Sequence, residues 1–301
     1  MERYNGNDVN IVIPDPVIKI GERAFEGCAG IQSVIFPPRV TEIGGNAFSD
    51  CQSLNEIEFS NGLETIGDGA FCRFHSLKHI NLPESIVYIY QRAFAGCIEL
   101  KNIAIPFNVR IIGAWTFCGC QSLDEVRLSD GLEAIGDEAF GDCCSLKQIK
   151  LPETVKWIGK YAFRNCTNLE VINIPNCVEC DDNYYDLDGV FQNCPSLREI
   201  IISEAQKERL FMRRGKVWAR REYGAKYIFE EKVYDDNDED REYSDKNCGS
   251  WYINFVRELR EESYKKVQVN RRAEGKCPYC GGAFTGLFTK KCARCGKFKD
   301  Y

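Results

Sequence analysis

The sequence predicts a solenoid in which short parallel strands are stacked coil upon coil. The first observation is a repeat, because a phenylalanine preceded by a small residue returns every 23 residues, at Phe25, Phe48, Phe71, Phe94, Phe117, Phe140 and Phe163. The second is that a cysteine or phenylalanine follows three residues later, and a leucine or isoleucine three residues after that. No such unit can bury its own apolar face, so the units are expected to stack. An eighth unit ends in Phe191, five residues late, which indicates an insertion within residues 177–189.

Each element of the unit has an expected place in a coil. In Leu54-x-x-Ile57-x-Phe59, apolar residues alternate with polar ones, which predicts a strand with one buried face. A proline then turns the chain in most units, and a second apolar pair, such as Leu63 and Ile66, enters the core from the other side. A glycine follows, at 21, 44, 67, 113, 136 and 159, where either a positive φ or a close approach of two backbones is expected.

This spacing and the I-G-x-x-A-F-x-x-C signature resemble the BspA-like (Treponema-type) leucine-rich repeats over residues 9–200. The resemblance implies a leucine-rich-repeat solenoid of short parallel strands, which is a right-handed superhelix, mostly β, with irregular or 3-10 turns. Members of this family are often surface or secreted proteins that bind other proteins. The resemblance therefore also implies a binding role.

The outward positions of the first strand are the candidate binding face. These positions vary from coil to coil while the inward ones hardly change, and strands on a rigid solenoid present a preorganised surface. The candidate residues are Glu56, Glu58, His79, Asn81, Asn102, Glu125, Arg127, Gln148 and Lys150. The alternative is that they are solvated strand residues without a special role. The expected partner is a protein whose identity the sequence does not give.

Seven of the 17 cysteines share one column of the repeat: Cys28, Cys51, Cys97, Cys120, Cys143, Cys166 and Cys194. Adjacent coils are close enough for disulfides, so a disulfide or metal ladder is one interpretation. We favour a buried, small, apolar residue with a weak S–H donor, because Phe74 replaces the cysteine in one unit. Cys177 and Cys180 form a lone C-x-x-C, for which we favour a structural role over a redox or metal site.

The last four cysteines are different. Cys277 and Cys280 form one C-x-x-C pair, Cys292 and Cys295 form another, and a glycine follows each pair. Four thiolates suit tetrahedral Zn²⁺ and leave no open position for catalysis, so the pattern predicts a structural zinc ribbon. A rubredoxin-like iron site is the alternative. A segment this small needs its metal to fold.

These patterns divide the chain into three expected regions. Residues 9–200 form the solenoid, residues 201–263 a helical cap with an acidic linker, and residues 264–301 the zinc ribbon. Within the middle region, residues 203–230 interleave aromatic and basic residues, and residues 250–267 have the spacing of an amphipathic helix.

Charge is divided unevenly along the chain. Residues 201–301 hold 23 Lys and Arg against 17 Asp and Glu, a net +6, which leaves −12 for residues 1–200. Residues 264–301 hold ten basic and two acidic residues among several aromatics. This composition makes nucleic-acid binding by the tail an alternative function, in which the solenoid recruits a protein. A surface adhesin-like binding protein is a further alternative.

No catalytic motif is found. The two histidines, His75 and His79, are expected in a turn and on a strand, and the carboxylates are scattered by the repeat. The sequence therefore predicts a protein that is not an enzyme and has no evident small-molecule substrate. No apolar stretch is long enough to span a membrane, and residues 1–10 lack a secretory signal, so we expect a cytoplasmic protein, or a secreted or surface one if the start has been trimmed.

Overall fold

The computed structural model describes residues 4, 6–175, 178, 187–202, 284–285 and 291–292. The chain forms two compact units, residues 1–248 and 249–301, and each is described by itself. The predicted helical segments after residue 202 lie outside the described residues, as do Cys177, Cys180, Cys277, Cys280 and Cys295. The expected boundaries of the three regions remain predictions.

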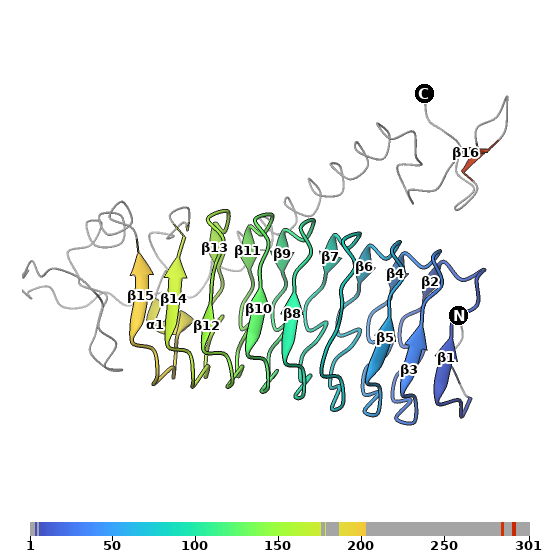
Figure 1. The fold of residues 1–301 in the computed structure, drawn as a ribbon, viewed down its shortest axis with the longest axis horizontal. Helices are drawn as coiled ribbons and strands as arrows, with labels where there is room; N and C mark the ends of the chain where they lie inside the picture. Colours follow the sequence, from blue (N-terminus) through green and yellow to red (C-terminus); the bar gives the residue numbers. More distant parts are fainter. Residues whose placement is uncertain are drawn as a thin grey trace, which may run out of the picture. The chain divides into compact units, whose positions relative to one another are not determined.

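The first strands of successive coils lie side by side and parallel (Figure 1). Their partners are 23 residues apart, as in Ser33 with Glu56, except that β14 pairs with β15 at a spacing of 28, as in Val171 with Glu199. His79 joins by an isolated bridge to Asn102. The middle residue of a strand points inward, so Val34 and Ile103 are buried. The strands are β1 (Asn10–Val12), β3 (Ser33–Ile35), β5 (Glu56–Glu58), β8 (Asn102–Ala104), β10 (Glu125–Arg127), β12 (Gln148–Ile149), β14 (Val171–Ile174) and β15 (Glu199–Ile202).

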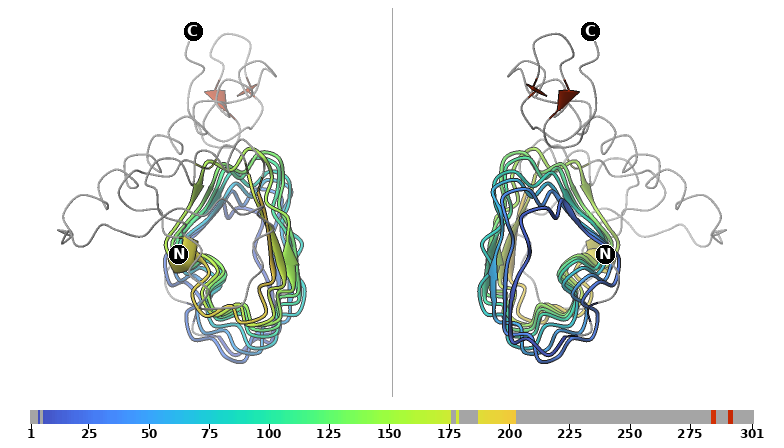
Figure 2. Two further views of the ribbon diagram at one scale, coloured as in Figure 1. Left: turned by 90° about the vertical axis from the view of Figure 1, so that its left-hand side faces the viewer. Right: turned by 90° about the vertical axis from the view of Figure 1, so that its right-hand side faces the viewer.

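The second strands of the coils form one parallel sheet of seven strands, in the order β13-β11-β9-β7-β6-β4-β2. These strands are β2 (Lys19–Ile20), β4 (Glu42–Ile43), β6 (Thr65–Ile66), β7 (Tyr88–Ile89), β9 (Ile111–Ile112), β11 (Ala134–Ile135) and β13 (Trp157–Ile158). Seen end-on in Figure 2, successive coils overlie one another and the two rows of strands form different walls. In the eighth coil the short helix α1 (Leu187–Val190) follows β14, after the insertion that the sequence predicts.

A column of stacked phenylalanine rings runs through the core of the solenoid. Neighbouring rings from Phe25 to Phe191 lie nearly parallel, with centroids 4.8 to 5.8 Å apart. At the amino-terminal end the Tyr4 ring lies 5.2 Å from that of Phe25, and its backbone N–H donates to the Ala24 carbonyl. The column therefore links each coil to the next and is covered by Tyr4 at its start.

The recurrence of glycine at one position of the coils is explained by the close approach of two backbones and not by a positive φ. A Cβ on Gly67 would lie 2.7 Å from the backbone carbon of Gly44 in the preceding coil, which no side chain tolerates. Positive φ values occur instead two residues later, mostly at residues other than glycine, such as Arg23, Trp115 and Tyr161, with φ of 55°, 55° and 60°. The inter-coil hydrogen bonds of this turn hold those residues in place, for example from the Trp115 N–H to the Asp137 carbonyl at 2.9 Å.

In the second unit, only one pair of strands belongs to the described residues. β16 (Phe284–Thr285) pairs antiparallel with β17 (Lys291–Cys292), and Phe284 lies opposite Cys292. The pair brings together the chain that follows the first C-x-x-C and the chain that begins the second.

The ring column gives a stability prediction. Phe94 is fully buried between two other rings, so Phe94→Ala should lower the free energy of unfolding by about 3–5 kcal/mol. Phe107 is 61% exposed, so Phe107→Ala is the matched control and should change it by about 0.5 kcal/mol or less. Urea unfolding followed by circular dichroism measures both, and equal losses would contradict the role given to the column.

Candidate binding face and cysteine column

The first-strand face consists of the outward side chains of the first strands from β1 to β15, together with His79, Asn81 and Lys150. Of the nine residues expected to bind a partner, Asn102 is half-buried and the other eight are exposed. The parallel register places them in rows across the coils, since Asn102 lies opposite both His79 and Glu125. The structure therefore brings the predicted residues together on one surface, and whether that surface binds a partner stays a prediction.

Polar contacts divide this face into two parts. The Asn102 side-chain amide contacts His79 Nδ1 at 3.0 Å, and Arg127 Nε donates to Glu125 Oε1 at 2.7 Å. Among the residues that the structure describes, Glu56 and Glu58 take part in no ion pair. The acidic charge at Glu56 and Glu58 is therefore available to an outside partner, while that of Glu125 is partly compensated.

An apolar pair adjoins the acidic pair, and this was not predicted from the sequence as part of the site. Val12 and Ile35 are opposite each other in the β1–β3 ladder and are 68% and 40% exposed. Ile35 in turn lies opposite Glu58. The alternation of exposed and buried residues along β1 was the available signal, since it places Val12 on the outer face of an amino-terminal coil.

The cysteine column is a ladder of S–H donors. The Sγ atom of each cysteine donates to the carbonyl of a phenylalanine in the preceding coil, at 3.0 to 3.3 Å, from Cys51, Cys97, Cys120, Cys143, Cys166 and Cys194. All six are buried, and the described cysteines form no disulfide. The interpretation as buried, small, weakly donating residues fits this geometry.

Burial raises the pKa of five thiols in this column. It raises the pKa of Cys51 and Cys194 to about 12, and it raises the pKa of Cys120, Cys143 and Cys166 well above the ordinary value. A thiol that stays protonated is a poor nucleophile and a poor metal ligand. The column is therefore structural.

The described part of the chain contains no group of three or more His, Cys, Asp or Glu side chains arranged to hold a metal ion. It also has no helix long and apolar enough to cross a bilayer. His75 and His79 are both exposed, and His79 lies in the strand ladder as expected.

The thiol ladder makes stability depend on pH. An unfolded cysteine ionises near pH 9, whereas folded Cys51 and Cys194 would ionise near 12, so ionisation favours the unfolded chain between these values. This contribution is complete below pH 9 and is lost as the pH rises toward 12. The double variant Cys51→Ser/Cys194→Ser should lose stability less steeply, by about 1.4 kcal/mol per pH unit for each thiol removed.

Urea unfolding of the parent and the variant from pH 8 to pH 11 measures this difference in slope. Lysine and tyrosine residues also titrate in this range, but they are the same in both proteins, so the difference reports the two thiols. Identical slopes in the two proteins would show that the buried thiols do not titrate as the structure requires.

Comparison with known proteins agrees with this fold. The family model described as BspA type leucine rich repeat region matches in six copies, over residues 4–120 and 88–211. No curated protein matches the chain. Solved structures with similar folds include a leucine rich cell surface protein from Faecalibacterium prausnitzii, with 22% identity over 69% of this chain and 91% of that one, at a TM-score of 0.45.

Two others are a leucine-rich repeat protein from Bacteroides ovatus (25% identity, 67% of this chain, 71% of that one, TM-score 0.43) and one from T. pallidum (27%, 66%, 72%, TM-score 0.32). The family model spans more than half of the chain. The chain belongs to the BspA-type leucine-rich repeat family.

Proposed function

We propose that the chain is a non-catalytic scaffold that holds another protein on its first-strand face. The observation that carries this proposal is the contrast between columns, because inward residues are repeated and buried while outward ones are varied and exposed. From β1 to β15 the face spans eight strand spacings, or about 38 Å. An interface of about 800 Å² per partner is roughly 28 Å across, so the face is long enough for one.

The amino-terminal half of this face defines the chemistry of the partner. Glu56 and Glu58 offer negative charge beside the exposed apolar pair Val12 and Ile35. A partner surface with an apolar centre and a basic rim complements this arrangement. Short strands held by hydrogen bonds on both sides lose little freedom on binding, which lowers the entropic cost of association.

Charge reversal tests the face. The triple variant Glu56→Lys/Glu58→Lys/Glu125→Lys should lose the proteins that the parent chain captures, because like charges would then face a basic rim. The matched control reverses three exposed acidic residues outside the face, in Asp15→Lys/Glu22→Lys/Asp130→Lys. Quantitative mass spectrometry of captured proteins compares the three baits.

Capture of the same partners by the triple variant would contradict the proposal. Each capture is repeated after nuclease treatment, because residues 264–301 are basic. Partners that disappear with nuclease would favour the nucleic-acid function instead.

We also propose a structural Zn²⁺ site formed by Cys277, Cys280, Cys292 and Cys295. The donor set supports it, since four thiolates match the tetrahedral preference of zinc. The antiparallel pairing of β16 with β17 supports it too, because the paired residues follow the first C-x-x-C and begin the second in the sequence, as one shared metal site would require. These residues would hold the ion, and the ion would stabilise the small module.

Metal analysis tests this site. Protein purified without added zinc should contain one Zn²⁺ per chain, and Cys280→Ser should lose it because a three-thiolate site binds less tightly. Cys118→Ser, which removes a cysteine of the solenoid, should keep it. A red iron chromophore in the parent protein, or no bound metal, would contradict the assignment.

A further inference from the structure

One row of outward residues on the first-strand face is complementary to its own reverse. At its two ends the row holds exposed apolar residues, Val12 in β1 and Ile201 in β15, which are 68% and 50% exposed. Further inward it holds the exposed charges Glu58, in β5, and Lys150, directly after β12. In the middle of the row β8 holds the small, exposed residue Ala104. The strand register and the 23-residue repeat place these residues in one line across the coils.

Two charges in the neighbouring row extend this pattern. Lys78 lies directly before His79, in the coil between β5 and β8, and Asp124 lies directly before β10. Both side chains are exposed, and their coils are the two neighbours of β8. A basic position on one side of β8 is therefore matched by an acidic position on the other side, both in this row and in the row of Glu58 and Lys150.

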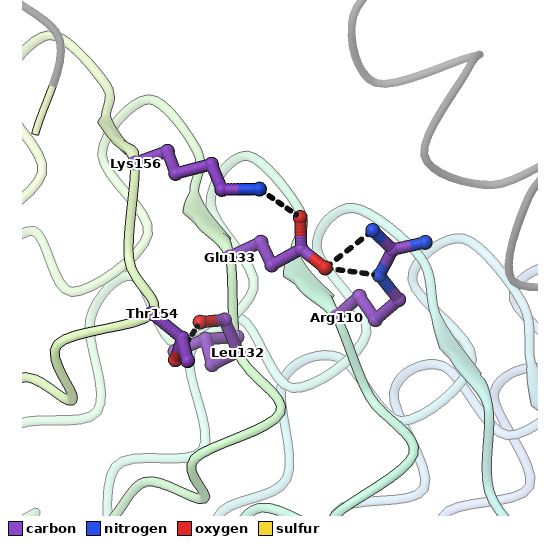
Figure 3. Close-up of polar contacts among 5 residues, drawn as sticks. All are labelled: Arg110, Leu132, Glu133, Thr154 and Lys156. Carbon is purple, nitrogen blue, oxygen red and sulfur yellow. Dashed lines mark hydrogen bonds and ion pairs between the residues drawn. The ribbon is translucent and has the colours of Figure 1, made fainter. Parts of the chain in front are cut away.

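The opposite charges of one row are too far apart to pair within one chain. Glu58 and Lys150 lie four coils apart, or about 19 Å, and among the described residues neither takes part in an ion pair. The wall formed by the second strands differs, since Figure 3 shows Glu133 between Arg110 and Lys156 from the two neighbouring coils. Charges of that wall are used within the chain, whereas those of Glu58 and Lys150 are available to a second molecule.

We propose that the partner of the first-strand face is a second copy of this chain, bound face to face with its coils running in the opposite direction. This inference rests on the proposed function, because it names the partner of the same face. The two-fold axis of the pair lies along β8, so strands at equal distances on either side of β8 face one another. In this arrangement β5 faces β12, and β1 faces β15.

The charges then meet in opposite pairs. Glu58 of one copy faces Lys150 of the other, Lys78 faces Asp124, and the two-fold axis repeats each contact. Lys101 lies beside the axis and faces the Lys101 of the other copy, but Asp124 of that copy is only one coil away, at about 4.8 Å along the axis. Each copy therefore supplies the charges that the other needs.

The apolar ends and the small middle residue complete the fit. Val12 of one copy faces Ile201 of the other, so two exposed apolar side chains are removed from water at each end of the contact. Ala104 lies on the axis and faces itself, which lets the two strands approach closely. The apolar side chains and basic rim that the acidic half of the face requires are thus present on the other half of the same face.

Other arrangements of two copies bring unlike or repelling side chains together. If the coils ran in the same direction, every strand would face itself and Glu58 would face Glu58. If the axis moved by one coil toward β5, Val12 would face Lys150, and if it moved by one coil toward β10, Glu58 would face Ile201. Like charges in contact, or a charge buried against an apolar side chain, oppose association.

The contact is small, and its size sets the strength to expect. Successive coils overlie one another in the end-on views (Figure 2), so the face has no sharp bend. A strip about 38 Å long and about 13 Å wide gives about 500 Å² on each copy, or about 1,000 Å² for the pair, which is the lower limit of specific interfaces. The dimer should therefore dissociate on dilution and at high salt.

Sedimentation equilibrium of the full chain, over a range of protein and salt concentrations, tests this pairing. The average mass of the parent should rise from one chain toward two as its concentration increases, and less so at high salt. Glu58→Lys and Lys150→Glu each place like charges together twice in the pair, so each should raise the dissociation constant roughly tenfold or more. Glu22→Lys reverses an exposed acid outside the face and is the matched control, which should leave the dissociation constant unchanged.

Mixing the two single variants gives the sharper result. In a mixed pair each position 58 faces a position 150 of opposite charge, so the two variants should associate with each other while neither associates with itself. The double variant Glu58→Lys/Lys150→Glu should recover self-association for the same reason. Damage to folding would not be repaired by mixing, so this recovery separates a lost contact from a lost fold.

Three results would overturn the inference. One is a parent chain that stays a single molecule at every concentration, and another is a mixture of the two variants that does not associate. The third is equal association of all variants, which would place the dimer on another surface. The capture experiment tests the proposed function separately, because a chain that stays single but captures other proteins through the face would keep that function and lose this inference.

Discussion

Contact between neighbouring coils is the constraint on which the rest of the structure depends. A coil of 23 residues is too thin to enclose its own phenylalanine, so each ring is buried by the rings before and after it. The strands have only two to four residues, and most of their hydrogen bonds also run between coils. Stability therefore accumulates along the axis, and an interruption in one coil affects both of its neighbours.

The same contact explains why a protein with 17 cysteines has a reduced core within its described part. At the position of the cysteine column, the side chain must be small and must donate a hydrogen bond to a carbonyl of the preceding coil. A thiol meets both requirements. Burial that protects the donor also suppresses ionisation, so these residues are removed from metal and redox chemistry. The metal chemistry proposed for this chain lies instead in its last four cysteines.

The repeat made the core predictable. Phenylalanine, cysteine and glycine recur at fixed positions because each meets the same neighbour in every coil, and the outward residues of the first strand follow from alternation. The positive φ at Trp115 and Tyr161 could not be predicted in this way, because neighbouring coils impose it on residues that do not favour it. Nor could the burial of Ala134 and Trp157, because a two-residue strand has the same sequence pattern whether its outer side is exposed or buried.

The proposed function depends on which walls of the solenoid are exposed. The second wall is charged and exposed at its amino-terminal end and apolar and buried at its carboxyl-terminal end, whereas most outward residues of the first-strand face are exposed. Under the proposed function, this rigid and exposed face would give a bound protein a defined orientation. That rigidity depends on the spacing of the coils, which the glycine positions set.

The most direct test of coil packing is therefore the free energy of unfolding of Gly67→Ala compared with that of Gly30→Ala. A Cβ at 67 would press against the backbone of Gly44 and Gly45 at 2.7 Å, whereas a Cβ at 30 would meet nothing within 4 Å. We predict a loss of about 2 kcal/mol or more for Gly67→Ala, with Gly30→Ala within about 0.5 kcal/mol of the parent. Equal stability of the two variants would contradict the claim that close contact between coils holds the structure together.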